Sequence, residues 1–199
     1  MKKKIGWSIF ALILIAFTCL YAVVDKNHNI YDRQIDSSEY ISVELAKGDT
    51  LIQSFVSEED FLDGINIKMS VTGEPAEKEV SYMLKDNEGQ EVASGKMSLE
   101  ELKSGKYFAL KFDRISGCKD QKYTLEFTVS QSMDEGAVIV YDVPGVQEDT
   151  EFTVRGEKVD GTLALRTITH RFDVETFVVT AIFAVYVILF IKWLGKVFK

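Results

Sequence analysis

The stretch INIKMSV, residues 65–71, alternates apolar and polar side chains without a break. In an extended chain successive side chains point to opposite faces, so its four apolar residues would share one face of a strand. The stretch YTLEFTV, residues 123–129, repeats the pattern. A period of two residues predicts β-strands with one buried face, and we expect the middle of the chain to be built from sheets.

Further short stretches with the composition of strands lie on both sides of these two, separated by turns rich in Gly, Asp, Asn and Pro. They are residues 40–45, 51–56, 80–85, 90–97, 106–112, 137–141, 151–155 and 162–169. About ten short strands within residues 39–171 predict an all-β domain, a β-sandwich or jelly roll, large enough to bury its own core.

Two apolar runs flank this domain, residues 5–24 and residues 174–194. About 20 apolar residues in a helix cross the hydrocarbon layer of a bilayer, so we expect two transmembrane α-helices. The alternatives are a buried helix of a soluble protein and, for the first run, a secretory signal peptide cleaved after Ala22 or a lipoprotein site at Cys19. Small residues do not precede either site in the usual pattern, which favours an uncleaved signal anchor.

Lysines lie at both ends of the chain, in tails of residues 1–4 and 195–199 and at position 192. Because Lys and Arg next to a span stay in the cytoplasm, both termini are expected inside and the middle outside, in a two-pass protein of the plasma membrane. Residues 25–38 are polar without a clear period, which predicts a tether. The residues expected at membrane interfaces are Trp7, Tyr21, Lys192 and Trp193.

Residues 25–175 are acidic, with 17 Lys and Arg against all 31 Asp and Glu of the chain, a net charge of −14. This charge disfavours binding of nucleic acid, which relies on Lys and Arg. The two cysteines, Cys19 in the first run and Cys118 in the middle, form no disulfide within the outer domain, and no Asn-x-Ser/Thr acceptor is present. An animal ectodomain would usually carry such features, so a bacterial envelope is favoured.

Motifs of catalysis are absent from the sequence: it has no phosphate-binding Gly-rich loop, no nucleophile elbow and no patterned metal ligands around its two histidines. We therefore expect that the protein is not an enzyme and that it binds no cofactor. Acidic clusters at residues 58–63, 86–88 and 134–135 could supply oxygen ligands to Ca²⁺, although solvated turns rich in Asp and Glu are far commoner. The spans hold no ionisable residue away from their ends, which is typical of anchors rather than channels.

Two tyrosines point away from the predicted core. In residues 106–112, Tyr107 shares the outer face of its strand with Lys111, and Tyr40 lies on the outer face of residues 40–45. Exposed aromatic rings often stack on sugars, so Tyr107, Tyr40 and Lys111 are the candidate ligand contacts. Tyrosine is also a common strand residue, which is the alternative explanation.

Residues 51–141 resemble the extracytoplasmic jelly-roll modules of bacterial multi-spanning membrane glycosyltransferases and polysaccharide-assembly proteins. The likeness is carried by residues 53–55 (QSF), 62–67 (LDGINI), 84–89 (LKDNEG), 112–115 (FDRI), 122–125 (KYTL) and 161–164 (GTLA). This resemblance supports a prediction of the fold more than a prediction of the ligand. Those proteins have many spans and a catalytic acidic loop, which this chain lacks, so the resemblance does not imply their activity.

Together these features predict a non-enzymatic bacterial cell-envelope protein whose anchored β-sandwich resembles carbohydrate-binding modules and is accessory to surface glycan assembly. The alternative is an interaction subunit of a membrane complex with no glycan binding. The expected partners are the lipid bilayer, a glycan, and a membrane glycosyltransferase or other membrane protein.

Overall fold

The computed structural model describes residues 2–132 and 136–198, with the backbone alone for residues 2–11, 131 and 132. The chain divides into two compact units. One comprises Met1–Lys26 together with His170–Lys199, and the other comprises Asn27–Thr169.

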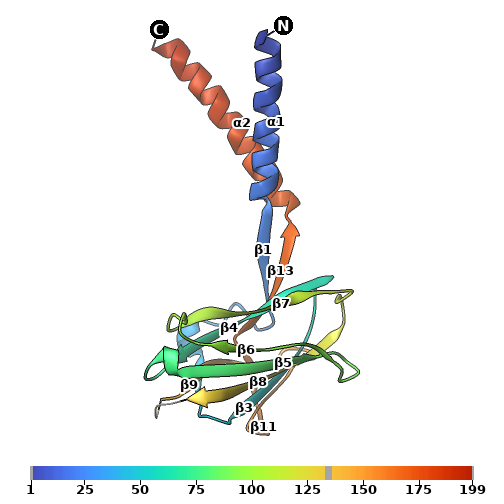
Figure 1. The fold of residues 1–199 in the computed structure, drawn as a ribbon, viewed down its shortest axis with the longest axis vertical. Coiled ribbons are helices and arrows are strands. Elements are labelled where there is room, and N and C mark those ends of the chain that lie inside the picture. Colours follow the sequence, from blue (N-terminus) through green and yellow to red (C-terminus); the bar gives the residue numbers. More distant parts are fainter. Residues whose placement is uncertain (1, 133–135, 199) are drawn as a thin grey trace. The chain divides into compact units, whose positions relative to one another are not determined.

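Two helices make up most of the first unit, α1 (Lys2–Tyr21) and α2 (Val174–Val197) (Figure 1). The 24 residues of α2, with a mean hydropathy of 2.5, are long and apolar enough to cross a membrane. In α1, the apolar stretch with described side chains, Leu12–Tyr21, is shorter. One helix that is long and apolar enough to span a membrane is therefore found among the described residues.

The first turn of α2 is fixed by Asp173, whose carboxylate accepts from the Thr176 amide at 3.1 Å and from Lys26 Nζ at 2.9 Å. Hydrogen bonds from the Thr176 side chain and from Lys26 lower the pKa of Asp173 to about 2. The Asp173 amide in turn donates to the Ala22 carbonyl at 2.8 Å, next to the end of α1. Asp173 is thus both the N-cap of one helix and a link to the other.

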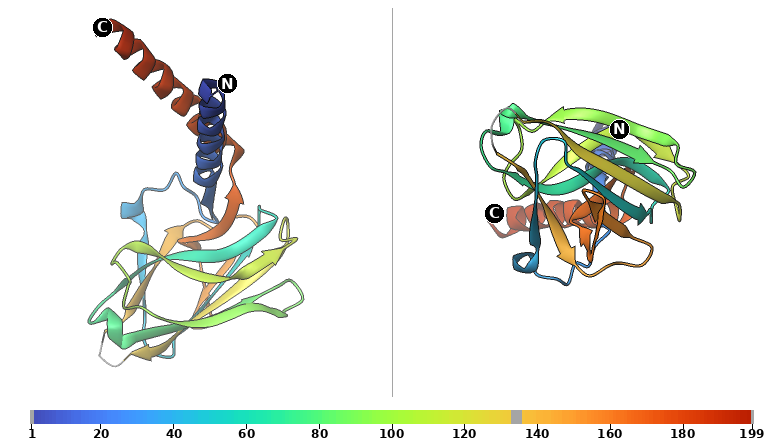
Figure 2. Two further views of the ribbon diagram at one scale, coloured as in Figure 1. Left: turned by 45° about the horizontal axis from the view of Figure 1, so that its top comes forward. Right: turned by 90° about the horizontal axis from the view of Figure 1, so that it is seen from below.

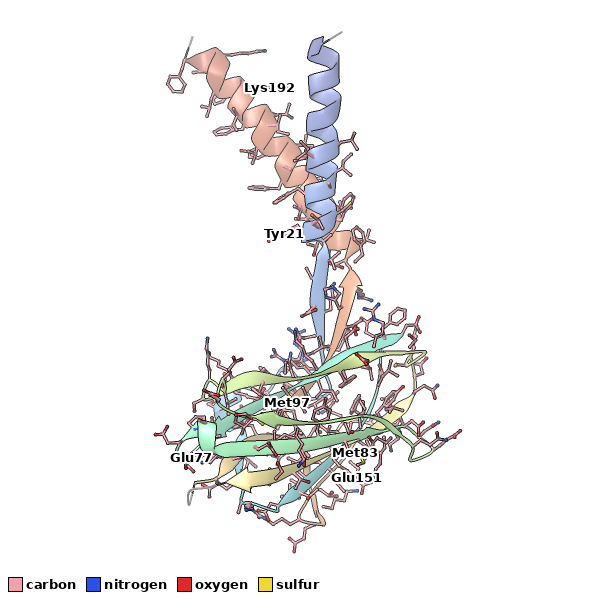
Figure 3. The ribbon with its side chains drawn as sticks, viewed as in Figure 1. Tyr21, Glu77, Met83, Met97, Glu151 and Lys192 are labelled. Carbon is pink, nitrogen blue, oxygen red and sulfur yellow. The ribbon has the colours of Figure 1, made fainter. Side chains whose placement is uncertain are left out.

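The residues expected at membrane interfaces are exposed where the structure describes them. Tyr21 stacks on Phe17 and Trp193 on Phe190, with ring centroids 6.3 Å and 5.9 Å apart. Figure 3 shows Tyr21 where α1 leads into the following strand, and Lys192 towards the C-terminal end of α2. The side chain of Trp7 lies outside the described residues.

The tether expected at residues 25–38 is wrong for residues 25–29. They belong to β1 (Val23–Asn29), which pairs with β13 (Leu165–Phe172) at the edge of a sheet. The strand was not evident from the sequence because polar residues occupy both of its faces, so that apolar alternation is missing.

Seven strands of the described chain form one antiparallel sheet in the order β1-β13-β4-β9-β12, with β2 added on β9 and β7 added on β4. The strands not yet bounded are β2 (Ile41–Leu45), β4 (Phe61–Val71), β7 (Lys106–Ser116), β9 (Val138–Pro144) and β12 (Gly161–Leu163).

Six other strands form a second antiparallel sheet in the order β11-β10-β3-β8-β5-β6 (Figure 1). They are β3 (Thr50–Val56), β5 (Lys78–Lys85), β6 (Glu91–Ser98), β8 (Lys122–Ser132), β10 (Glu151–Val154) and β11 (Glu157–Val159). Short 3-10 helices lie at Ser37–Glu39 and Pro75–Glu77.

The core lies between the two sheets, which gives the second unit a sandwich-like β fold (Figure 2). We call this second unit, Asn27–Thr169, the β unit. The two alternating stretches of sequence are confirmed as strands with one buried face. Their fully or almost fully buried side chains are Ile65, Ile67 and Met69 of β4 and Tyr123, Leu125, Phe127 and Val129 of β8. Both sheets thus contribute the apolar faces that their alternation predicts.

Two details differ from the sequence expectation. Because Tyr40 was placed on the outer face of residues 40–45, alternation predicts that Ile41 faces inward, but Ile41 is 55% exposed at the start of β2. The predicted strand at residues 162–169 is broken at Ala164, whose amide donates to the Tyr141 carbonyl and whose carbonyl accepts from the Lys68 amide. The chain changes partner strand at this residue, from β9 to β4.

Candidate functional site

Tyr107 and Tyr40 both belong to a group of aromatic and cationic side chains on the outer face of the seven-stranded sheet. Tyr31, which is buried, joins them. Its hydroxyl hydrogen-bonds the hydroxyl of Tyr107, and its ring meets that of Tyr40 edge to face, with centroids 6.0 Å apart. Tyr31 belongs to the segment after β1, so this segment is held against the sheet by its aromatic side chain.

Two cations lie against the tyrosine rings. The guanidinium of Arg166 is centred 3.7 Å from the centroid of the Tyr107 ring, and its Nη2 lies 3.3 Å from the Tyr31 hydroxyl. Lys68 Nζ lies 4.8 Å from the centroid of the Tyr40 ring and 5.2 Å from that of Tyr141. Cation–π contacts of this kind stabilise both partners when water is partly excluded. We call these residues the tyrosine cluster: Tyr31, Tyr40, Lys68, Tyr107, Tyr141 and Arg166.

Partial burial raises the pKa of two phenols of the cluster, those of Tyr40 and Tyr107. It raises the pKa of Tyr40 to about 12, with the nearby Tyr31 acting in the same direction. Burial and the Tyr31 hydrogen bond raise the pKa of Tyr107 as well. The phenols of Tyr40 and Tyr107 therefore act as neutral hydrogen-bonding groups, and the guanidinium of Arg166 already lies over one face of the Tyr107 ring.

Lys111 is not part of this cluster. It lies four residues beyond Tyr107 on β7, about 13 Å along a strand, and its side chain is exposed. Its carbonyl accepts a hydrogen bond from the Tyr82 hydroxyl at 3.1 Å. The structure therefore brings together two of the three candidate ligand residues.

A cleft of about 590 Å³ adjoins the tyrosine cluster and shares Tyr31 with it. Its walls come from segments far apart in the sequence: residues 29–34, residues 55–58, Asp120 and residues 147–150. Five carboxylates line it against one guanidinium, that of Arg33, and we call it the acidic cleft. The carboxylates are those of Asp32, Glu58, Asp120, Glu148 and Asp149.

The walls of the acidic cleft are shaped by local hydrogen bonds. Asp32 Oδ1 accepts from the Gln34 amide at 2.8 Å, a turn typical of aspartate. The Thr150 hydroxyl donates to the Gln147 carbonyl at 2.9 Å, which closes the turn of residues 147–150 that forms another wall. Asp149 within this turn has a φ of 60°, a left-handed conformation that aspartate tolerates better than most residues.

The acidic clusters noted in the sequence are largely held by neighbouring groups. His28 contacts both Glu58 and Glu59, at 3.1 and 2.8 Å, and Arg114 contacts Asp63 at 2.8 Å. Asp86 Oδ1 accepts from two backbone amides of its own turn. Residues 134–135 lie outside the described residues. Among those described, no three His, Cys, Asp or Glu side chains are grouped to hold a metal ion.

Sequence patterns did not reveal Tyr31, Arg166, Lys68 or the acidic cleft. Arg166 and Lys68 are on outward positions of β13 and β4, where a charged residue normally means a solvated surface. The signal for Tyr31 was weak, since it lies in a polar segment without periodicity.

No family model and no curated protein matches this chain. Among solved structures, that of the infectious bursal disease virus Gx strain has a TM-score of 0.33 and 12% identity, over 73% of this chain and 35% of that one. The mitogen derived from Yersinia pseudotuberculosis has a TM-score of 0.27 and 9% identity, over 64% of this chain and 94% of that one. This chain thus spans about a third of the viral chain. Similarities at this level carry no argument about function.

Proposed function

We propose that this chain is a non-enzymatic cell-envelope protein whose β unit binds a glycan in the acidic cleft. The observation that carries the proposal is the lining of the cleft, where amide, carboxylate and guanidinium groups converge beside the ring of Tyr31. Such side chains offer paired donors and acceptors, which suit neighbouring sugar hydroxyls. A concave site with a few convergent polar groups is the usual form of a small-ligand site.

The acidic cleft supports this proposal better than the outer faces of Tyr107 and Tyr40. Arg166 covers one face of the Tyr107 ring, and Lys68 and Tyr31 contact Tyr40. A sugar stacking on those covered faces would have to displace cations. In the proposed function, the tyrosine cluster positions residues 29–34 as one wall of the cleft.

Membrane anchoring is the second part of the proposal. α2 is long and apolar enough to span, and we propose that α1 is an uncleaved anchor that spans beside it. The lysines at both ends of the chain favour cytoplasmic termini and an extracytoplasmic β unit. The absence of sequons and of a disulfide pair in the β unit favours a bacterial envelope, where a jelly-roll module would be accessory to glycan assembly.

A second candidate function is an interaction subunit that binds a protein. The specific observation in its favour is the excess of carboxylates in the acidic cleft, five against one guanidinium. Such a surface complements a basic segment of a partner more strongly than a neutral sugar. The two candidates differ in salt dependence, since binding of a basic segment weakens steeply with ionic strength.

The test uses the full chain reconstituted in lipid nanodiscs and applied to an array of bacterial envelope polysaccharides and their oligosaccharides. Glycan binding that persists at high salt supports the first candidate. Absence of binding across the array, together with recovery of a stoichiometric protein partner by crosslinking in intact membranes, would replace it with the second.

A further inference from the structure

Asp142 is a buried carboxylate near the end of β9. Its residue is 3% exposed, and among the described residues its Oδ1 has no hydrogen-bond partner. The amide of Thr162 donates to the same carboxyl group. A buried carboxylate with an unsatisfied oxygen is costly, so its presence calls for a physical explanation.

The neighbouring strands leave little room around this carboxyl group. In the sheet, Asp142 lies opposite Leu163 of β12 on one side and opposite Ile41 of β2 on the other. A Cβ atom at position 161 would lie 1.9 Å from Oδ1, so Gly161 is required for the carboxyl group to fit. Asp142 is therefore almost entirely enclosed by its neighbours.

Thr162 connects Asp142 to the acidic cleft. Its amide contacts the Asp142 carboxyl group, while its hydroxyl donates to the Gly145 carbonyl at 3.0 Å and accepts from the Gln147 amide at 3.4 Å. Gln147 begins the turn of residues 147–150 that forms one wall of the cleft. A change at Asp142 therefore reaches the cleft wall through a single residue.

We propose that Asp142 is a proton-controlled support of this wall: when it is neutral the β9–β12 pairing is tight and the turn at residues 147–150 is held in place, and when it is charged the pairing loosens. This regulation rests on the proposed function of the acidic cleft. The ligand would accordingly bind more tightly at acid pH.

The electrostatic surroundings agree with the geometry. Burial raises the pKa of Asp142 to about 6, the Thr162 amide opposes this shift, and the negative charge of Asp160 adds to it. Asp160, just before β12, is the charged group that acts on the carboxyl. The sheet partners Leu163 and Ile41 are apolar, and the nearby polar residue Thr162 is uncharged.

The experiment follows the amide signals of Thr162 and Gln147 by ¹⁵N NMR of the selectively labelled full chain in nanodiscs, from pH 4.5 to pH 8. We expect both signals to shift together with a midpoint near pH 6. Asp142→Asn should abolish this transition. Asp160→Asn, which leaves Asp142 in place, should move the midpoint to lower pH because a like charge is removed.

Each outcome has a distinct meaning. Amide signals that do not change between pH 5 and pH 7.5, or a transition that survives in Asp142→Asn, would overturn the proposal. A transition that behaves as expected, in a protein that binds no glycan at any pH, would leave the support of the wall intact and count against the proposed function.

Discussion

Tyr31 and Tyr107, 76 residues apart in the sequence, hydrogen-bond each other through their phenolic hydroxyls. The contact fastens the segment after β1 to β7 of the seven-stranded sheet. Because Tyr31 also lines the acidic cleft, the bond fixes one wall of the candidate site.

Tyr31→Ala should destabilise the β unit by about 3 kcal/mol, since it removes a buried ring and leaves a cavity. Tyr31→Phe keeps the ring and loses the hydroxyl, and should cost about 1 kcal/mol. Denaturant unfolding of the full chain in detergent measures both. The control is Tyr21→Phe, on an exposed tyrosine of α1. Equal stability of Tyr31→Ala and the control would show that Tyr31 does not hold the segment.

Asp142→Asn should stabilise the protein by about 1–2 kcal/mol at pH 7.5, where the native carboxylate is charged and buried. The folded-state pKa of about 6 lies above the ordinary value of 3.8. The group therefore favours folding most at pH values below 3.8, and this contribution is lost as the pH rises through 6. Unfolding at pH 4 and pH 7.5 measures the difference, which should nearly vanish at pH 4. A variant less stable than the native chain at pH 7.5 would refute the prediction.

Asp173→Ala should loosen the first turn of α2, because the Thr176 amide and Lys26 both lose their acceptor. Hydrogen exchange of the full chain in nanodiscs should show faster exchange at Thr176 and Phe177. Asp173→Ser, which can still cap the helix, is the matched control. The pKa of Asp173 is lowered, so its contribution is present above pH 3.8 and is lost as the pH falls towards 2. Unchanged exchange in Asp173→Ala would mean that the cap is not needed.

The proposed topology predicts which positions a membrane-impermeant thiol reagent can reach in intact cells. A cysteine introduced at Glu157, exposed in β11, should react from outside. Cysteines introduced at Lys2 and at Lys199 should react only after the membrane is permeabilised. Labelling at Lys2 from outside, or loss of this residue by cleavage, would contradict the uncleaved anchor.

Local periodicity was enough to predict the sheets. Stretches such as residues 65–71 and 123–129 carry their burial pattern in the alternation itself, and their inward residues are buried as expected, except that Val71 is only half-buried. β1 could not be predicted in this way, because most of its residues are polar and it forms a strand by pairing with β13, which is distant in the sequence. Asn29, for instance, contacts Arg166, 137 residues away, at 2.7 Å.

The candidate site was predicted in part. Alternation placed Tyr107 and Tyr40 outside the core, but whether their ring faces are free depends on Arg166 and Lys68, which lie on other strands. The acidic cleft is assembled from four separate parts of the chain and has no local signal. Asp142 had a local signal in the sequence, because it continues the alternation of Val138 and Val140, which places its side chain on the buried face.

The most direct test of the account is the glycan affinity of the full chain in nanodiscs after the charges of the 147–150 wall are removed. The double variant Glu148→Gln and Asp149→Asn keeps the shape of the side chains, and asparagine tolerates the left-handed backbone at position 149. Glu157→Gln, outside the cleft, is the control. We expect affinity to fall at least about tenfold in the double variant and to stay unchanged in the control. A tenfold fall corresponds to the loss of roughly one charged hydrogen bond. Equal affinity in all three proteins would contradict binding in the acidic cleft.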